Sequence, residues 1–193
     1  FFIFLSAFAA SIIIDIDKSM ISKLLALENV AYYAVAVFIA AVIDTPSRAM
    51  FQIVNPLVSK AISNNDKNRL EELLKKSSMS LFLISGLIFL LINTNIGDIY
   101  NVVESINKIQ GYSIAIPVVL IISISKLYTS TIGCVNNIIS NSNFYQYILF
   151  FSIFSALSLF FLNIYFIENI GLIGAAYSTL IIIVVFNLLK IIL

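Results

Sequence analysis

The sequence has no histidine, a single cysteine and few charged residues. Because Cys134 has no second cysteine to pair with, an intrachain disulfide is excluded, and the absence of histidine argues against a zinc site as well. Charged residues make up 11% of the chain and leave a net charge of +1. This balance does not point to nucleic acid or to an acidic soluble partner.

Hydrophobic residues, in contrast, account for 61% of the chain, and the mean hydropathy is +1.05. Stretches of about 18 or more apolar residues are long enough to span a bilayer core. The stretches fall at residues 1–26, 32–57, 77–96, 112–132, 144–166 and 171–193. Segments of about 10 residues that alternate apolar and polar side chains, as in a membrane β-barrel, do not occur. The sequence therefore predicts an all-α, polytopic bundle of six transmembrane helices.

A charged segment, residues 63–76, separates the second and third apolar stretches. Asn65 or Asp66 can cap a short helix here. Two acid–base pairs follow at the favourable i,i+4 spacing, Glu71 with Lys75 and Glu72 with Lys76. The segment is interpreted either as an amphipathic helix along the membrane or as a solvated connector between two spans.

The positions of the basic residues predict the orientation of the chain in the membrane. Five of them lie in residues 58–76, around the connection between the second and third apolar stretches. They are Lys60, Lys67, Arg69, Lys75 and Lys76. By the positive-inside rule, residues 58–76 are cytoplasmic, both ends of the chain are cytoplasmic, and loops 27–31, 97–111 and 167–170 lie outside. Since the chain begins and ends within apolar stretches, we expect it to be a fragment of a larger protein.

Two charged side chains, Asp44 and Arg48, lie inside the second stretch, four residues apart and with Pro46 between them. A charge at the bilayer centre costs about 2.5 to 3.5 kcal/mol, so both should face a protein interior or a watery cavity. A cavity role and a mutually neutralising pair are both open. Pro46 favours the cavity because it frees a backbone carbonyl.

Lys126 is a charged residue within the fourth apolar stretch, residues 112–132. Hydroxyl side chains surround it, namely Ser123, Ser125, Tyr128, Thr129, Ser130 and Thr131. These neighbours favour a polar-lined face, although the lysine stem could also reach a nearby interface.

The end of the first stretch carries a polar stripe. If the helix continues to about Ala26, four polar residues fall on one face: Asp15, Lys18, Ser19 and Ser22. A polar stripe on an apolar helix indicates that this face lines a water-filled space. The alternative is that the span ends at Ile14 and these residues form a loop.

Two later segments have simpler interpretations. Residues 136–143 are polar, uncharged and rich in asparagine, which predicts a turn. Small residues open the sixth stretch, with Gly171, Ala175 and Thr179 at i,i+4,i+8 spacing. This spacing predicts a close helix-packing face without a substrate role.

Three groups of residues resemble bacterial polysaccharide or O-antigen flippases, in the second half of those proteins. The first comprises Ile16-Asp17-Lys18-Ser19-Met20-Ile21, Val30-Ala31-Tyr32-Tyr33 and Asn55-Pro56-Leu57-Val58-Ser59-Lys60-Ala61. The second comprises Ser125-Lys126-Leu127, Gly133, Asn136-Asn137-Ile138-Ile139, Ser142 and Tyr145. The third is Gly171-Leu172-Ile173-Gly174-Ala175-Ala176-Tyr177-Ser178-Thr179. Lys18 stands where that family often has arginine, and Asn136-Asn137 where Asn-Gly is common.

This flippase family shares a superfamily with multidrug and toxin extrusion (MATE) transporters and with lipid II flippases. The resemblance implies a two-lobed transporter in the bacterial cytoplasmic (inner) membrane, of which residues 1–193 are most of the C-terminal lobe. The implied activity is export, by alternating access, of an oligosaccharide linked to a polyprenyl pyrophosphate. The implied partners are this lipid-linked substrate, membrane lipids and the N-terminal lobe of the same chain. No cofactor is implied beyond a coupling ion, H⁺ or Na⁺.

On this hypothesis a central cavity accepts the anionic pyrophosphate and the sugars. Its charged lining is predicted to include Asp15, Asp17, Lys18, Asp44, Arg48 and Lys126. A cation in a cavity of low dielectric constant attracts phosphate more strongly than it would in water.

Three alternatives compete with the flippase hypothesis. A MATE-like exporter of small cationic compounds would favour uncompensated acids, whereas lysine and arginine accompany the acids here. A membrane glycosyltransferase is suggested by Asp15-Ile16-Asp17, which matches a D-x-D metal-binding pattern, but no second catalytic carboxylate or histidine cluster accompanies it. Charges buried in the spans argue against the third alternative, a purely structural subunit.

Overall fold

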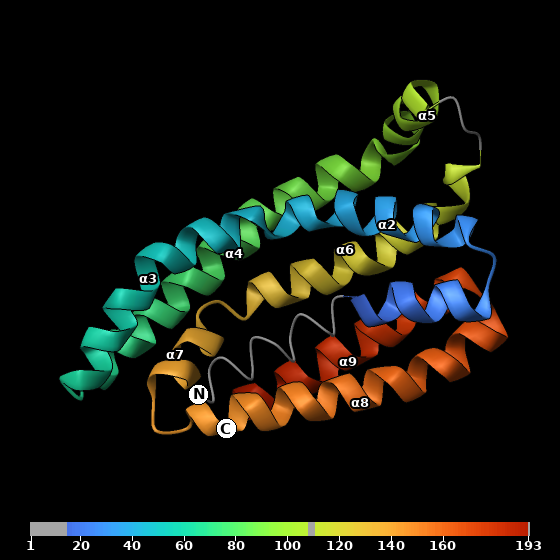
Figure 1. The fold of residues 1–193 in the computed structure, drawn as a ribbon. Coiled ribbons are helices and arrows are strands. Elements are labelled where there is room, and N and C mark those ends of the chain that lie inside the picture. Colours follow the sequence, from blue (N-terminus) through green and yellow to red (C-terminus); the bar gives the residue numbers. More distant parts are fainter. Residues whose placement is uncertain (1–14, 108–110, 193) are drawn as a thin grey trace.

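A computed structural model describes residues 15–107 and 111–192 (Figure 1). Within these ranges the chain is helical and contains no β-strand. Residues 15–24 form the first helical segment. The elements that follow are α2 (Glu28–Ala41), η1 (Val42–Asp44), α3 (Thr45–Ser63), α4 (Lys67–Thr94), α5 (Ile96–Asn107), η2 (Tyr112–Ala115), α6 (Ile116–Thr131), α7 (Val135–Asn141), α8 (Tyr145–Ile170) and α9 (Leu172–Ile192). The predicted all-α fold is confirmed for the described residues.

Five helices in the described ranges are long and apolar enough to cross a membrane, which indicates a membrane protein. They are Glu28–Ser63, Lys67–Thr94, Tyr112–Thr131, Tyr145–Ile170 and Leu172–Ile192. Most of the first predicted span, residues 1–26, lies outside the described residues, so the count of six spans stays a prediction. Large apolar side chains on these helices are exposed, among them Phe82, Leu87, Phe154 and Phe161. Exposed apolar side chains on long helices suit contact with lipid.

Helix α6 lies in the middle of the bundle and packs against α2, α4 and α9. Figure 1 shows α2, α3 and α4 on one side of it and segment 15–24, α8 and α9 on the other. The main hydrophobic core joins these layers through side chains such as Ile21, Ala36, Val119 and Ala175. The bundle thus brings residues from both ends of the sequence into one interior.

Helices α2 and α3 form one long rod with a short 3₁₀ turn, η1, between them. The turn coincides with Pro46, which is in the first turn of α3 and has no backbone N–H. Because the α-helical pattern would require that N–H to bond Val42, the preceding residues tighten into a 3₁₀ turn instead.

The charged connection contains no separate helix along the membrane. Helix α3 runs on to Ser63, and α4 already begins at Lys67, so the charged residues form the ends of two long helices and the exposed turn that connects them. The predicted cap is confirmed, because the Asp66 carboxylate accepts a hydrogen bond from the Arg69 backbone N–H at 3.0 Å. Both predicted ion pairs are also present, with Nζ–Oε1 distances of 2.5 Å for Lys75 and Glu71 and 2.6 Å for Lys76 and Glu72.

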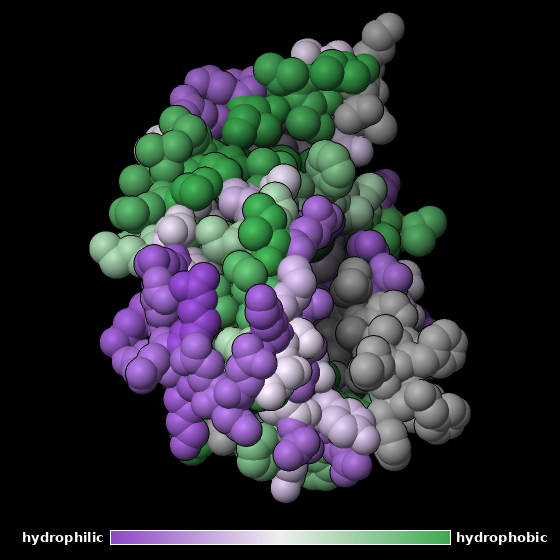
Figure 2. All heavy atoms as spheres, turned by 90° about the vertical axis from the view of Figure 1, so that its left-hand side faces the viewer, coloured by the Kyte–Doolittle hydropathy of each residue, from purple (hydrophilic) through white to green (hydrophobic). Residues whose placement is uncertain are grey.

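Hydrophilic side chains gather at one end of the molecule. Figure 2 shows them over the end of the bundle that carries the α3–α4 turn and α7, with hydrophobic side chains on the flank above. Helix α5 lies at the opposite end (Figure 1). The two ends of the bundle thus differ in character, and the side of the membrane that each one faces stays a prediction.

Four predicted loops turn out to be partly or wholly helical. In the first, residues 27–31, helix α2 already begins at Glu28. The asparagine-rich turn is the short helix α7, and much of the predicted outer loop 97–111 is helix α5. The predicted loop 167–170 belongs to α8, which continues to Ile170 and is joined to α9 by Gly171 alone. Gly171 has a φ of +68°, a left-handed conformation that glycine adopts without strain.

Small residues bring α8 and α9 close together, as the sequence predicts. A Cβ atom added to Gly174 would lie 2.1 Å from the backbone oxygen of Phe166, so only glycine fits there. Ala175 and Ala176 are fully buried beside it. The tight turn at Gly171 and the close contact at Gly174 together place α9 against the inner side of α8.

Candidate functional site

Asp17 lies on the inner face of segment 15–24. Its side chain is only 5% exposed, and Met20 and Ile21 share its buried face. Asp15, Ser19 and Ser22 are exposed. The helical interpretation of these residues is therefore confirmed over 15–24, and the loop alternative is wrong.

Three helices supply hydrogen bonds to the buried carboxylate. The Tyr33 hydroxyl of α2 donates to Asp17 Oδ2 at 2.7 Å, and the Thr179 hydroxyl of α9 donates to the same oxygen at 2.8 Å. The Asn163 amide of α8 donates to Oδ1 at 2.7 Å. Buried carboxylates are retained only when such donors replace water. Asp17 is thus the point at which segment 15–24, α2, α8 and α9 are tied together.

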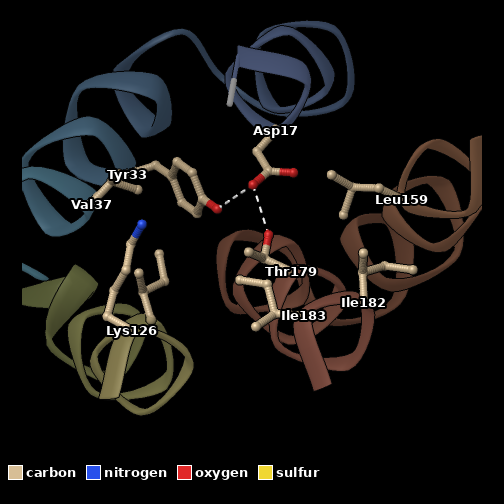
Figure 3. A pocket seen from close by; sticks show the side chains of 9 residues that line it. Asp17, Tyr33, Val37, Lys126, Leu159, Thr179, Ile182 and Ile183 are labelled. Carbon is tan, nitrogen blue, oxygen red and sulfur yellow. Dashed lines mark hydrogen bonds between the residues drawn. The ribbon is translucent and has the colours of Figure 1, made fainter. Parts of the chain in front are cut away.

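A pocket of about 150 Å³ opens beside this carboxylate. Its polar lining is Asp17, Tyr33, Thr179 and Lys126, and its remaining walls are aliphatic, for example Val37 of α2 and Ile182 of α9. Figure 3 shows these side chains arranged around the space, with the Tyr33 and Thr179 hydroxyls directed at Asp17. The pocket is large enough for several water molecules or for one small polar group.

Lys126 projects from α6 into the same pocket. In Figure 3 its ammonium group lies beside Val37 and the Tyr33 ring, on the side of the ring away from Asp17. No described residue forms an ion pair with it. A partly buried ammonium without a counter-ion attracts an anion strongly. The structure therefore places two of the predicted site residues, Asp17 and Lys126, around one space.

Asp15 and Lys18 lie outside this pocket. They pair with each other across one turn of segment 15–24, at an Nζ–Oδ1 distance of 3.0 Å. The Asp15 side chain is 72% exposed and the Lys18 side chain 36% exposed. The predicted polar stripe exists, but it faces away from the described core.

Asp44 and Arg48 are also outside the pocket and, although both are described, they form no ion pair with each other. Arg48 is exposed and Asp44 is half-buried. Asp44 is the last residue of η1 and Arg48 lies one turn into α3. The structure thus offers no contact to support the neutralising pair that their spacing suggests, and their predicted cavity role stays a prediction.

The hydroxyl side chains around Lys126 do not form one continuous polar face. Ser125 and Thr129 bond backbone oxygens of their own helix, and Ser130 lies 3.2 Å from the Ser47 hydroxyl of α3. Among the described residues, Ser123 and Tyr128 have buried hydroxyls without a partner. Lys126 is the one polar residue of α6 found in the described pocket lining.

Sequence reasoning missed three residues of the site: Tyr33, Asn163 and Thr179. Asn163 carried a usable signal, because an amide in the middle of a long apolar stretch needs a partner inside the protein. Thr179 was assigned to helix packing alone, yet its hydroxyl bonds both Asp17 and the backbone oxygen of Ala175. The spacing of Tyr33 from Asp17 did not indicate a contact, because the two residues lie on different helices.

The D-x-D pattern does not converge on one point. Residues two apart on a helix point to different sides, and accordingly Asp15 is exposed while Asp17 is buried. Among the described residues, no cluster of three or more histidine, cysteine, aspartate or glutamate side chains could hold a metal ion.

Comparisons of the chain with protein-family models, with curated proteins and with solved structures gave no match. The site is therefore interpreted from its own chemistry. That chemistry is a hydrogen-bonded carboxylate and an unpaired ammonium in a small pocket of an apolar helix bundle.

Proposed function

We propose that this protein moves a lipid-linked oligosaccharide across the bacterial cytoplasmic membrane for the synthesis of a surface polysaccharide. The chain acts as the C-terminal lobe of a two-lobed transporter that works by alternating access. The substrate is an oligosaccharide on a polyprenyl pyrophosphate, and the lipid tail stays in the bilayer during transfer. This proposal combines the sequence resemblance with the charges that the bundle keeps in its interior.

The pocket between Asp17 and Lys126 is the observation that carries the proposal. A helix bundle with a lipid-facing surface has no structural need for an ammonium without a counter-ion, because burial of a charge costs free energy. Lys126 offers that charge to an anionic group such as pyrophosphate. Arg48, Lys18, Asp15 and Asp44 would contribute to the same cavity from positions nearer the surface of the described lobe.

A coupling ion, H⁺ or Na⁺, belongs to the same proposal. Among the described residues, Asp17 is the one acidic or basic side chain that is buried. Such a carboxylate changes the electrostatics of the pocket whenever its charge is neutralised. This makes Asp17 the residue through which an ion gradient would act on the transport step.

The test separates transport from sugar transfer. We expect the double variant Asp15→Asn with Asp17→Asn to synthesise the carrier-linked oligosaccharide normally and to accumulate it, because other proteins make it. Arg48→Ala and Lys126→Ala should also accumulate product. Failure to form any carrier-linked product in the double variant, with the protein intact in the membrane, would contradict the flippase and favour a glycosyltransferase.

A further inference from the structure

Helix α5 has an apolar side that is wider than the bundle covers. Four of its residues, at i,i+3,i+4,i+7 spacing, pack against the main hydrophobic core: Ile96, Ile99, Tyr100 and Val103. Beside this buried stripe lie two further apolar residues, Val102 and Ile106. Their side chains are 57% and 73% exposed. The described bundle therefore leaves a strip of apolar surface on α5 uncovered.

The remaining side of α5 is polar. Asp98, Asn101 and Ser105 lie on it at i,i+3,i+7 spacing, and all three are exposed. Around the helix, Val102 and Ile106 come between this polar side and the buried stripe. A helix that is divided in this way suits a boundary between water and an apolar medium.

The end of α4 places α5 at such a boundary. Leu90 and Leu91 are exposed apolar residues near the end of this candidate span. Residues 93–95 are polar, and their side chains donate hydrogen bonds to backbone oxygens of α4. Helix α5 then begins at Ile96. Because a span leaves the hydrocarbon core where its side chains change from apolar to polar, α5 lies at the surface of that core.

The figures show which way this part of the molecule faces. In Figure 1, α5 lies at the edge of the bundle, above the end of α2. Figure 2 views the bundle from its charged end and shows mostly hydrophobic side chains toward the top, the height at which Figure 1 places α5. The side of this region that faces back along the spans, and so toward a bilayer around them, is apolar.

Hydrogen bonds hold α5 against the start of the next span. The Glu104 Oε1 atom accepts from the backbone N–H groups of Gly111 and Ser113, at 3.1 and 3.2 Å. Ser113 belongs to η2, which leads directly into α6. Helix α5 is thus attached to the end of one span and the start of another, and both attachments set its depth.

Lipid fits the uncovered strip better than protein does. A stable protein interface buries about 800 Å² on each partner, and two side chains provide far less. Helix α5 contains two acidic residues, Asp98 and Glu104, and no basic one. Attraction to anionic headgroups therefore does not hold it, and apolar contact must supply the binding free energy.

We propose that α5 is an interfacial helix, which embeds Val102 and Ile106 among the acyl chains just below the headgroups and keeps its polar side in water. Its partner is a lipid surface with neutral or zwitterionic headgroups. This contact fixes the depth at which α6, the helix that carries Lys126, enters the membrane. The inference goes beyond the proposed function and holds for either orientation of the chain.

A single tryptophan measures this contact, because the sequence contains none. The variant Ile106→Trp is placed in phosphatidylcholine vesicles whose acyl chains carry bromine near the headgroup, and bromine quenches tryptophan on contact. We expect its fluorescence to fall severalfold relative to vesicles without bromine. Bromine at the far end of the acyl chains should quench it less, and iodide in the water should quench it little.

The matched control is Ser105→Trp, one residue away on the polar side of the same helix. It should show the opposite pattern, with strong quenching by iodide and little by brominated lipid. Val102→Trp provides a second position in the apolar strip in case Ile106→Trp does not fold, and it should behave as expected for Ile106→Trp.

Two results would overturn the proposal. Quenching by iodide in the strip variants, as strong as in Ser105→Trp, would show that water covers the strip. Protection from both bromine and iodide would show that protein covers it, such as a second copy of the chain. Neither measurement involves transport, so failure here is distinct from failure of the flippase assignment, which the carrier-linked product tests.

Discussion

Asp17 and Asp44 both lie where the sequence predicts a membrane span, but their surroundings differ completely. Asp17 is buried and accepts hydrogen bonds from three helices, and Lys126, from a fourth, lines the same pocket. Asp44 is half-buried at the end of a 3₁₀ turn, and Arg48, one turn away, does not pair with it. One carboxylate organises the bundle interior, and the other lies at its margin.

The difference shows that spacing along one helix is a poor guide to a functional charge pair. Residues at i,i+4 share a face of the helix, but their side chains pair only if the ion pair lowers the free energy. At water-accessible positions such a pair contributes little, about 0 to 1 kcal/mol. A charge tied into hydrogen bonds from distant parts of the chain has a far larger effect. The predictions that follow test this contrast, from the largest expected effect to the smallest.

Replacing Asp17 by alanine should have the largest effect on stability. The change leaves the Tyr33 hydroxyl and the Asn163 amide without an acceptor, whereas Thr179 keeps the Ala175 backbone oxygen, and each buried unsatisfied group costs about 1 to 3 kcal/mol. We therefore expect the free energy of unfolding in detergent to fall by about 2 kcal/mol or more. The matched control is Asp15→Ala, which removes one exposed ion pair and should cost about 1 kcal/mol or less. Similar losses in both variants would remove the distinction between the two faces of segment 15–24.

Lys126→Met should reduce export while leaving stability almost unchanged. Methionine preserves the apolar stem of the lysine but removes the charge that attracts the anionic substrate. Charged hydrogen bonds contribute about 1.5 to 3 kcal/mol, so we expect export to fall about tenfold or more. Lys23→Met, in the exposed part of segment 15–24, is the control and should export normally. Normal export by Lys126→Met would show that the pocket cation does not bind substrate.

The changes Asp44→Asn and Arg48→Gln should be additive. Because the two side chains form no ion pair, removal of one leaves the environment of the other unchanged. The measurement is export by each single variant and by the double variant at matched protein levels. A double variant that exports better than either single one would show that the residues do pair in another conformation, as their spacing suggests.

Cysteine labelling at two exposed residues should affect neither stability nor export, yet it fixes the orientation of both regions. Asn68 is the second residue of α4, at the charged end, and Ser105 lies in α5 at the opposite end (Figure 1). We expect Asn68→Cys to react with an impermeant thiol reagent only from the cytoplasm and Ser105→Cys only from outside. The buried native Cys134 should remain unreactive in both. Labelling of both positions from one side would overturn the orientation.

How far the sequence could predict this structure depends on the range of the interactions involved. The helix cap at Asp66 and the pairs at Lys75 and Lys76 were predictable because their partners lie within one turn. The ends of α3 and α8 were not, since helices that continue beyond the bilayer core leave no break in hydrophobicity to mark them. Composition likewise identified the long apolar helices but could not distinguish a short asparagine-rich helix from a turn.

The candidate site was only partly predictable for the same reason. Asp17 and Lys126 stand out as charges in apolar surroundings, so local reasoning found them. Tyr33, Asn163 and Thr179 join Asp17 from 16, 146 and 162 residues away in the chain, and no local pattern encodes those contacts. Asp15, two residues from Asp17, looked equivalent in sequence and differs only because the helix turns it outward.

The location of the carrier-linked oligosaccharide in cells with Asp17→Asn tests the central claim most directly. Asparagine keeps the shape of the side chain, and Asn163, whose Oδ1 has no partner among the described residues, can turn to accept from it. The fold should therefore survive while the charge is lost. We predict normal synthesis of the oligosaccharide and its accumulation on the cytoplasmic leaflet. Unimpaired delivery to the outer leaflet by Asp17→Asn would contradict the account.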